Sequence, residues 1–208
     1  MFRRRPGRRP PVFRRRFPRR PGGPPHRPPL PPRVRRVLMR ANKLMASERF
    51  TEAAAIFEEL SEKADQHGMP VRAADLALQA SRACLAAGDP QAAVEWGEKA
   101  LRLLVRGGRA DRVPRVLPRM INVLRQHGYD AQADQFEQEA EKVLDEAGLS
   151  LAEMRLRAPQ ATEQFAAQRG TLPAQCSGCG ASLVPDEVEW HDARTAECLY
   201  CGTVCKTT

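Results

Sequence analysis

The sequence lacks any apolar run near the length of about 18 residues that a membrane-spanning helix needs. Its N-terminus has basic residues without the apolar stretch of a secretory signal, so neither a membrane span nor export by that route is predicted. Six cysteines in 208 residues are too few for a disulfide scaffold. No Ser-His-Asp or Cys-His order stands out as catalytic machinery. We therefore expect a cytoplasmic protein that is not an enzyme and has no small-molecule substrate.

Acidic side chains are absent from residues 1–33, which hold 12 Arg and 11 Pro. Residues 34–208 carry 22 basic and 25 acidic side chains and sum to −3, although the whole chain carries +9. The few apolar side chains of the first segment are scattered singly, so their burial cannot offset the entropy lost when a backbone becomes ordered. Residues 1–33 are predicted to form a disordered Arg/Pro-rich arm.

Arginine clusters at residues 3–5 and 14–16 of this arm suit phosphate groups, and the interleaved phenylalanines can stack on unpaired bases. Nucleic acid, as RNA or single-stranded DNA, or another polyanion is therefore one expected partner, with strongly salt-dependent binding. The alternative is a solubilising tail. A third interpretation uses Pro28, Pro31 and Arg33, which match a P-x-x-P-x-R ligand for aromatic-lined grooves.

Residues 34–148 contain three units that align without gaps at an offset of 40. Each half of the unit has the spacing of one helical stripe. The stripe in the first half comprises Val37, Leu38, Ala41, Leu44 and Met45, then Ala77, Leu78, Ser81, Cys84 and Leu85, then Leu117, Pro118, Ile121, Leu124 and Arg125. The stripe in the second half comprises Ala53, Ile56, Leu60 and Ala64, then Ala93, Trp96, Ala100 and Leu104, then Ala133, Phe136, Ala140 and Leu144.

Glycines punctuate these units at positions where a helix would end in a left-handed cap. Gly68, Gly108 and Gly148 end the units, and glycines 88 and 128 separate their halves. The sequence Gly88-Asp89-Pro90 indicates a helix stop, an N-cap and a first helical residue. Each unit is therefore predicted to be a pair of antiparallel helices, over residues 34–46 and 50–67, 70–87 and 90–106, and 110–127 and 130–147.

The segments FTEAAAIFEEL at residues 50–60 and GDPQAAVEWGEKAL at residues 88–101 resemble the tetratricopeptide repeat family. Its helix hairpins place a small residue early in the second helix and an aromatic residue shortly after it. The resemblance implies a solenoid of three tandem helix hairpins over residues 34–148. It also implies a protein-binding scaffold whose concave face holds a peptide or a partner helix.

Three reactive side chains in this region have structural explanations. Cys84 occupies the position filled by Leu44 and Leu124, so we expect a core residue. His67 and His127 each precede a glycine that ends a helix, where an imidazole complements the helix dipole. We expect none of the three to bind metal or to act as a catalyst.

Residues 149–172 are predicted to be a capping helix and a linker. Leu149 to Leu156 can form a short amphipathic helix with Ser150 as its N-cap, which would cover the open end of the array. Beyond Pro159 the sequence fits either a further short helix or a tether.

Four cysteines near the C-terminus form two C-x-x-C pairs that are separated by 18 residues, within the range of structural zinc sites. A two-residue gap lets both sulfurs of a pair turn toward one ion, and four thiolates complete a tetrahedron. A β-hairpin is predicted between the pairs, where Val188 and Trp190 alternate with polar residues. The predicted ligands of one structural zinc per chain are Cys176, Cys179, Cys198 and Cys201.

Residues 173–208 resemble a zinc ribbon, in which a glycine follows each pair, here Gly180 and Gly202. So few residues cannot hold a fold by hydrophobic burial alone, so the ion is expected to supply the stability. An iron site with the same ligands or a pair of disulfides are the alternatives. His191 and Cys205 are spare ligands, and His191 is expected to be exposed on the hairpin turn.

The expected fold is mainly α, with three helix hairpins, a small β zinc ribbon and a disordered arm. The expected function is that of a non-enzymatic intracellular adaptor, which binds a protein partner on the helical-repeat face. The alternative is a nucleic-acid-binding accessory protein that uses the arm and the ribbon. A thiol oxidoreductase is a distant third, because no βαβ pattern surrounds either C-x-x-C pair.

Overall fold

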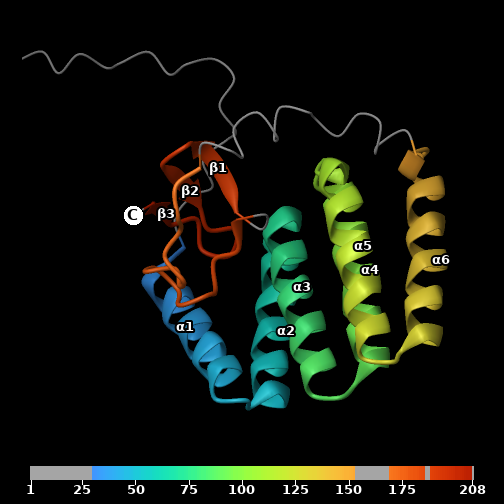
Figure 1. Cartoon of the computed structure of the whole chain (residues 1–208), viewed down its shortest axis with the longest axis horizontal. Coiled ribbons are helices and arrows are strands. Elements are labelled where there is room, and N and C mark those ends of the chain that lie inside the picture. The colour runs from blue at the N-terminus through green and yellow to red at the C-terminus, as the bar shows by residue number, and fades with distance from the viewer. Residues whose placement is uncertain (1–29, 153–168, 186–187, 208) are drawn as a thin grey trace, which may run out of the picture.

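A computed structural model of the chain describes residues 30–152, 169–185 and 188–207. Nearly all of the predicted arm and most of the predicted connector, at residues 1–29 and 153–168, lie outside the described residues. The described part is mainly helical, with a small antiparallel sheet near the C-terminus (Figure 1). Its α-helices are α1 (Pro32–Ala46), α2 (Phe50–Gln66), α3 (Pro70–Ala86), α4 (Pro90–Arg106), α5 (Val113–Gln126) and α6 (Asp130–Glu146).

The six α-helices of the described residues form an array of three consecutive hairpins (Figure 1). Helix α2 lies against α1 and α3, and α3 lies against α4. Helix α6 packs against both α4 and α5, whereas α4 and α5 make only a small contact. The predicted mainly α fold and its helix hairpins are confirmed. Helix α1 begins at Pro32, inside the predicted arm, so Arg33 of the P-x-x-P-x-R match is helical rather than extended.

The turns that follow the six helices recur every 20 residues. Five of them hold a glycine with φ between +66° and +84°, at positions 68, 88, 108, 128 and 148. The first turn has Glu48 at the corresponding position with φ of +59°, a conformation that an L side chain disfavours. As predicted, Asp89 is an N-cap: its side chain accepts a hydrogen bond of 2.9 Å from the Ala92 N–H, and Pro90 opens α4.

Buried positions follow the same 20-residue spacing. One set is at most 1% exposed and comprises Ala53, Ala73, Ala93, Val113 and Ala133. A second set, close to the end of each helix, is also buried and comprises Leu44, Ala64, Cys84, Leu104, Leu124 and Leu144. The 40-residue unit is therefore a pair of similar helix-and-turn segments, each of 20 residues.

Helix α3 sits at the centre of the closest packing. Five of its alanines are fully buried, and their small side chains let the neighbouring helices approach: Ala73, Ala74, Ala77, Ala80 and Ala83. Ser61 Oγ donates a 2.9 Å hydrogen bond to the carbonyl of Ala73. Ser81 Oγ donates one of 2.6 Å to the carbonyl of Ala93, so the same bond joins α2 to α3 and α3 to α4.

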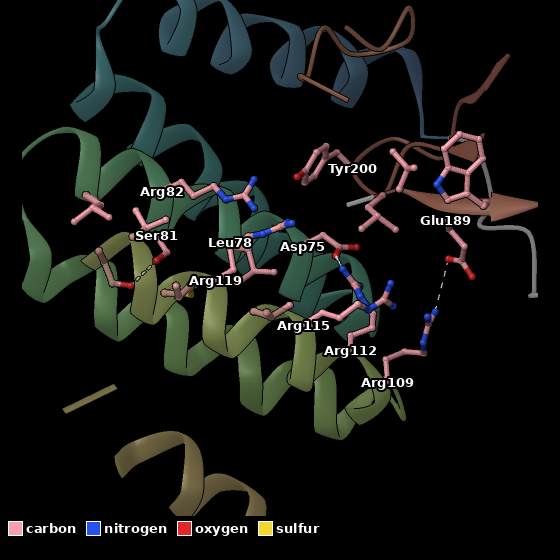
Figure 2. A pocket seen from close by; sticks show the side chains of 18 of the residues that line it. Asp75, Leu78, Ser81, Arg82, Arg109, Arg112, Arg115, Arg119, Glu189 and Tyr200 are labelled. Carbon is pink, nitrogen blue, oxygen red and sulfur yellow. Dashed lines mark hydrogen bonds and ion pairs between the residues drawn. The ribbon is translucent and has the colours of Figure 1, made fainter. Parts of the chain in front are cut away.

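The third hairpin departs from this pattern. A single 3-10 turn, Ala110–Arg112, precedes α5, and Pro118 lies inside that helix. Met120 projects from α5 toward α4, where a Cβ atom placed on Gly97 would lie only 2.5 Å from its Cε atom. Helices α4 and α5 otherwise make only a small contact, and a cavity lies between α3, α5 and the C-terminal residues (Figure 2).

In the predicted second-half stripe, Ile56, Trp96 and Phe136 occupy equivalent positions, but only one of the three is fully buried. Ile56 and Trp96 are partly exposed, and Lys99 Nζ lies 4.1 Å from the Trp96 ring centre. Only Phe136 of the three is fully buried, whereas Phe57, absent from the predicted stripe, is 1% exposed. Phe57 is buried because α2 packs on both α1 and α3, so its buried arc is wider than one stripe.

We call residues 169–185 and 188–207 the ribbon. Its antiparallel sheet has the order β1 (Glu189–Asp192), β2 (Thr195–Glu197) and β3 (Val204–Lys206). The hairpin of β1 and β2 is the predicted one, and it has a bulge between Trp190 and Asp192. At its turn, the pKa of the Asp192 carboxyl is lowered because the Arg194 N–H donates to it at 2.7 Å. Strand β3, which follows the last cysteine pair, was not predicted.

Two further predictions, the capping helix and the lack of a membrane span, can be compared with the described residues. Of the predicted capping helix, Leu151 and Ala152 are helical, Leu149 and Ser150 are not, and residues 153–156 lie outside the described residues. Among the helices that the structure describes, none combines the length and the apolar composition needed to cross a membrane.

Candidate metal centre

The two C-x-x-C pairs form two turns with the same backbone hydrogen bonds. In the first, the N–H of Gly180 donates to the carbonyl of Cys176 at 2.8 Å. In the second, the N–H of Gly202 donates to the carbonyl of Cys198 at 2.9 Å. Both glycines have positive φ, of +75° and +73°, a conformation that glycine adopts without steric cost. The local sequence therefore turns both cysteines of each pair toward the same side.

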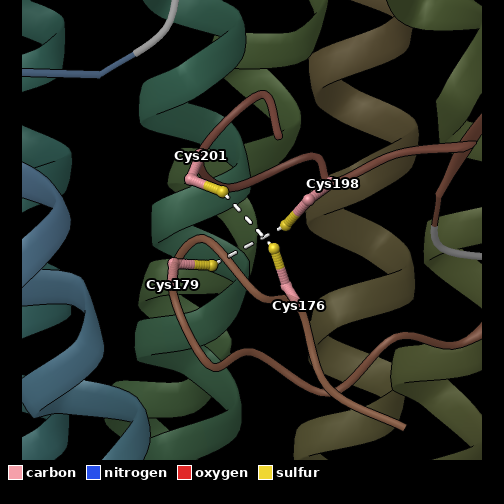
Figure 3. Close-up of side chains that lie close together, drawn as sticks. All are labelled: Cys176, Cys179, Cys198 and Cys201. Atoms are coloured by element: carbon pink, nitrogen blue, oxygen red, sulfur yellow. Dashed lines mark hydrogen bonds between the residues drawn. The ribbon is translucent and has the colours of Figure 1, made fainter. Parts of the chain in front are cut away.

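Four sulfur atoms converge between these turns (Figure 3). All four predicted ligands are buried, and their Sγ atoms lie within 4.8 Å of one another. The Sγ atoms of Cys176 and Cys201 are 3.6 Å apart, and those of Cys179 and Cys198 are 3.8 Å apart. A tetrahedral ion with metal–sulfur bonds of about 2.3 Å would require sulfurs about 3.8 Å apart. A disulfide would require about 2.05 Å, and all four cysteines are free thiols.

Ionisation of these thiols is strongly coupled. Hydrogen bonds from Cys179, and then from Cys198 and Cys201, lower the pKa of Cys176. The pKa of Cys198 is raised, first by its hydrogen bonds to Cys176 and Cys179 and then by burial. The buried cluster thus resists holding four negative charges at once. A bound cation removes that restriction, so the donor set fits a thiophilic metal ion.

Neighbouring groups support the cluster from outside. The N–H of Gly178 donates to Cys176 Sγ at 3.3 Å, and Thr203 Oγ1 lies 3.1 Å from Cys201 Sγ. Cys205 is buried, with its Sγ 3.9 Å from that of Cys176, and burial raises the pKa of its thiol to about 11. Cys205 therefore acts as a thiol donor beside a complete set of four ligands.

His191 does not have the predicted position on the hairpin turn. It lies in β1, its side chain is 17% exposed, and its Nε2 atom is 3.2 Å from Glu197 Oε2. The bulge in β1 turns His191 toward β2, where Glu197 is buried. The imidazole of His191 therefore contacts a carboxylate of the sheet and is not part of the cysteine cluster.

The first cysteine turn rests on helix α1. Asn42 Nδ2 donates a hydrogen bond of 2.8 Å to the carbonyl of Cys179. Arg35 Nε donates one of 3.2 Å to the carbonyl of Gly178, from one face of the same helix. Farther along the ribbon, Arg109 lies 3.8 Å from Glu189. These contacts place the ribbon against the array (Figure 1).

The other reactive side chains lie where the sequence predicted. Cys84 is buried in α3, and burial, together with the nearby Glu58 carboxylate, raises the pKa of its thiol to about 12. A thiol held in its protonated form is a poor nucleophile and a poor metal ligand. His67 and His127 are the C-cap residues of α2 and α5.

Some parts of the site were missed by sequence reasoning. The contacts from Arg35 and Asn42 link residues more than 130 positions apart, and no local pattern signals them. Gly178 did carry a local signal, because it is a glycine inside the first C-x-x-C pair. A Cβ atom at this position would lie 2.0 Å from Thr203 Oγ1, which is too close for a side chain. Comparison of the chain with protein-family models, with curated proteins and with solved structures gives no match.

Proposed function

We propose that this protein is a non-enzymatic cytoplasmic adaptor, built on a tetratricopeptide-like helical array and completed by a structural zinc ribbon. The array would bind a protein partner, and the ribbon would form part of the same contact surface. Zinc is the ion that four thiolates in a tetrahedron suit best in a reducing compartment.

The chemistry of the cysteine cluster supports a structural ion. Four buried thiolates fill a tetrahedral coordination sphere, so no position remains for a catalytic water or a substrate. Protein purified without chelator should contain about one zinc per chain by elemental analysis. Iron in place of zinc, or a metal content well below one per chain, would contradict the assignment.

The observation that carries the adaptor proposal is the position of the exposed apolar side chains. The large hydrophobic side chains that are exposed in the described residues are confined to α1 and the ribbon: Val37, Met39, Val184 and Val204. These two elements are joined by the hydrogen bonds of Arg35 and Asn42. We propose that these four side chains belong to one surface that binds a protein partner, since a contiguous exposed apolar patch marks such a site.

The test is capture of a partner by variants of this surface, with cross-links mapped by mass spectrometry. Met39→Glu and Val204→Glu should each abolish capture, because a charge would be buried against the partner. Ala55→Glu, an exposed position on α2, adds the same charge elsewhere and should leave capture unchanged. Deletion of residues 1–29 should also leave it unchanged. Capture that survives both surface substitutions would refute the proposal.

A second candidate, nucleic-acid binding, is favoured by the charge of α1. This helix has five basic and no acidic side chains, and the exposed ones, Arg33, Arg36, Arg40 and Lys43, follow one helical stripe. The stripe continues the cationic arm. Under this alternative, Arg36→Gln with Arg40→Gln should weaken retention on immobilised RNA and lower its dependence on salt. Deletion of residues 1–29 should weaken it further.

A further inference from the structure

A cavity of about 750 Å³ lies where the ribbon faces α3 and α5 (Figure 2). Its volume is within the range of about 300 to 1,000 Å³ that is typical of sites for small ligands. The helices supply one wall and the ribbon supplies the other, including Trp190 and Tyr200. Helix α5 makes only a small contact with α4, whereas α3 packs closely on both α2 and α4.

Arginine dominates the polar lining of the cavity. Helix α5 and the 3-10 turn before it contribute Arg112, Arg115 and Arg119, at spacings that place all three on one helical face. Helix α3 adds Arg82 on the opposite side. The described lining residues comprise six arginines and three carboxylates, an excess of three positive charges. Such a lining favours an anionic ligand.

One donor of the Arg112 side chain has no acceptor in the described part of the chain. This side chain is 7% exposed, and its Nη2 atom lies 2.8 Å from Oδ1 of the buried Asp75. Its Nη1 atom is buried and has no hydrogen-bond partner among the described residues. A buried donor without a partner is costly, and a ligand oxygen in this cavity would satisfy it.

Apolar side chains complete the lining and shape the expected ligand. Leu78, Leu85, Val116 and Met120 come from the helices, beside the arginines. Arg112 and Arg119 are seven residues apart, which corresponds to about 10 Å along a helix axis. A single carboxylate cannot reach both, whereas a chain of phosphates can contact several guanidinium groups.

We infer that this cavity binds a small organic phosphate of nucleotide size. The phosphate chain lies along Arg112, Arg115 and Arg119, and Nη1 of Arg112 donates to a phosphate oxygen. The organic part lies against the apolar wall beneath the ribbon. The ligand therefore touches the array and the ribbon together and strengthens their contact. This inference goes beyond the proposed adaptor role and does not rest on it.

The test is isothermal titration of the full metal-loaded chain with ATP at physiological salt, with pyrophosphate and adenosine as partial ligands. One ATP site per chain is expected, pyrophosphate should bind more weakly, and adenosine should give no heat. The double variant Arg115→Gln/Arg119→Gln should lose at least tenfold in ATP affinity. Both positions are at least partly exposed, so this variant should fold, with helical content checked by circular dichroism.

The matched control is Arg102→Gln/Arg125→Gln, which removes two arginines of α4 and α5 that do not line the cavity. It should bind ATP like the original chain, and both double variants keep the cationic arm. Equal ATP affinity in the two variants would assign the binding to the arm and overturn the inference. Absence of ATP binding by the original chain, or adenosine binding as tight as ATP, would also overturn it.

Hydrogen exchange supplies a second measurement that does not depend on substitution. Saturating ATP should slow amide exchange at least severalfold in both α5 and β1, since the cavity is lined by both. Protection confined to α1 or to residues 1–29 would place the ligand elsewhere and overturn the inference.

Discussion

The array and the ribbon belong to one chain but are stabilised in different ways. The array buries side chains such as Phe57, Phe136 and Leu104 between successive helices, each held by its neighbours. The ribbon buries five cysteines, four of them in the cluster, and its other buried hydrophobic side chains are few: Ala181, Leu183, Val188, Ala196 and Tyr200. A segment of fewer than about 40 residues rarely folds on hydrophobic burial alone. From this comparison we propose that the array depends on packing and that the ribbon depends on a metal ion held by its four clustered cysteines.

Removal of the metal should separate the two parts most clearly. Chelation, or Cys198→Ser, should abolish amide protection throughout β1, β2 and β3 while the helices keep theirs. The expected effect is large because structural zinc contributes about 10 to 16 kcal/mol in zinc-finger peptides. Cys84→Ser removes a cysteine outside the cluster and should leave ribbon protection and metal content unchanged. Strands that stay protected without metal would show that packing holds the ribbon.

The converse change is a cavity in the array. Phe136→Ala should lower the free energy of unfolding of the helices by about 3 to 5 kcal/mol, since this side chain is fully buried. Urea denaturation followed by circular dichroism measures it. The half-buried Trp96→Ala should cost less. Both variants should keep about one zinc per chain, and loss of the metal from Phe136→Ala would mean that the ribbon needs the array in order to fold.

A smaller effect is expected at the contact between the two parts. Asn42→Ala removes the hydrogen bond to the Cys179 carbonyl and should weaken docking of the ribbon by about 1 kcal/mol. Hydrogen exchange at residues 176–180 should become faster without loss of metal. Lys43→Ala, at the exposed neighbouring position, is the control and should change nothing. Equal exchange in both variants would show that this hydrogen bond does not hold the ribbon.

The smallest expected effect concerns the turns of the array. Glu48→Gly should stabilise the helices by about 0.5 kcal/mol, because relief of the left-handed strain exceeds the added entropy of glycine in the unfolded chain. Gly88→Ala, at the equivalent turn, should have the opposite sign and cost about 1 kcal/mol. Thermal unfolding of both variants measures the pair. A destabilised Glu48→Gly variant would mean that the Glu48 side chain contributes more than its backbone strain costs.

Much of the fold could be predicted because its signals are local. The turn glycines, the Asp89 cap and the spacing of apolar side chains determine where each helix begins and ends. The same is true of the cysteine turns, in which Gly180 and Gly202 lie next to the residues they position. The predicted stripe failed at Ile56 and Phe57, since burial there depends on two neighbouring helices rather than one.

The sequence by itself determined the helices, their repeat and the four converging cysteines, because each depends on residues within a few positions of one another. Only the tertiary structure decided that the ribbon lies on α1, that His191 pairs with Glu197, and that a cavity rich in arginine separates α3 from α5. These features join residues far apart in the chain. Their formation depends on the sizes of side chains packed between whole elements, which no local pattern records.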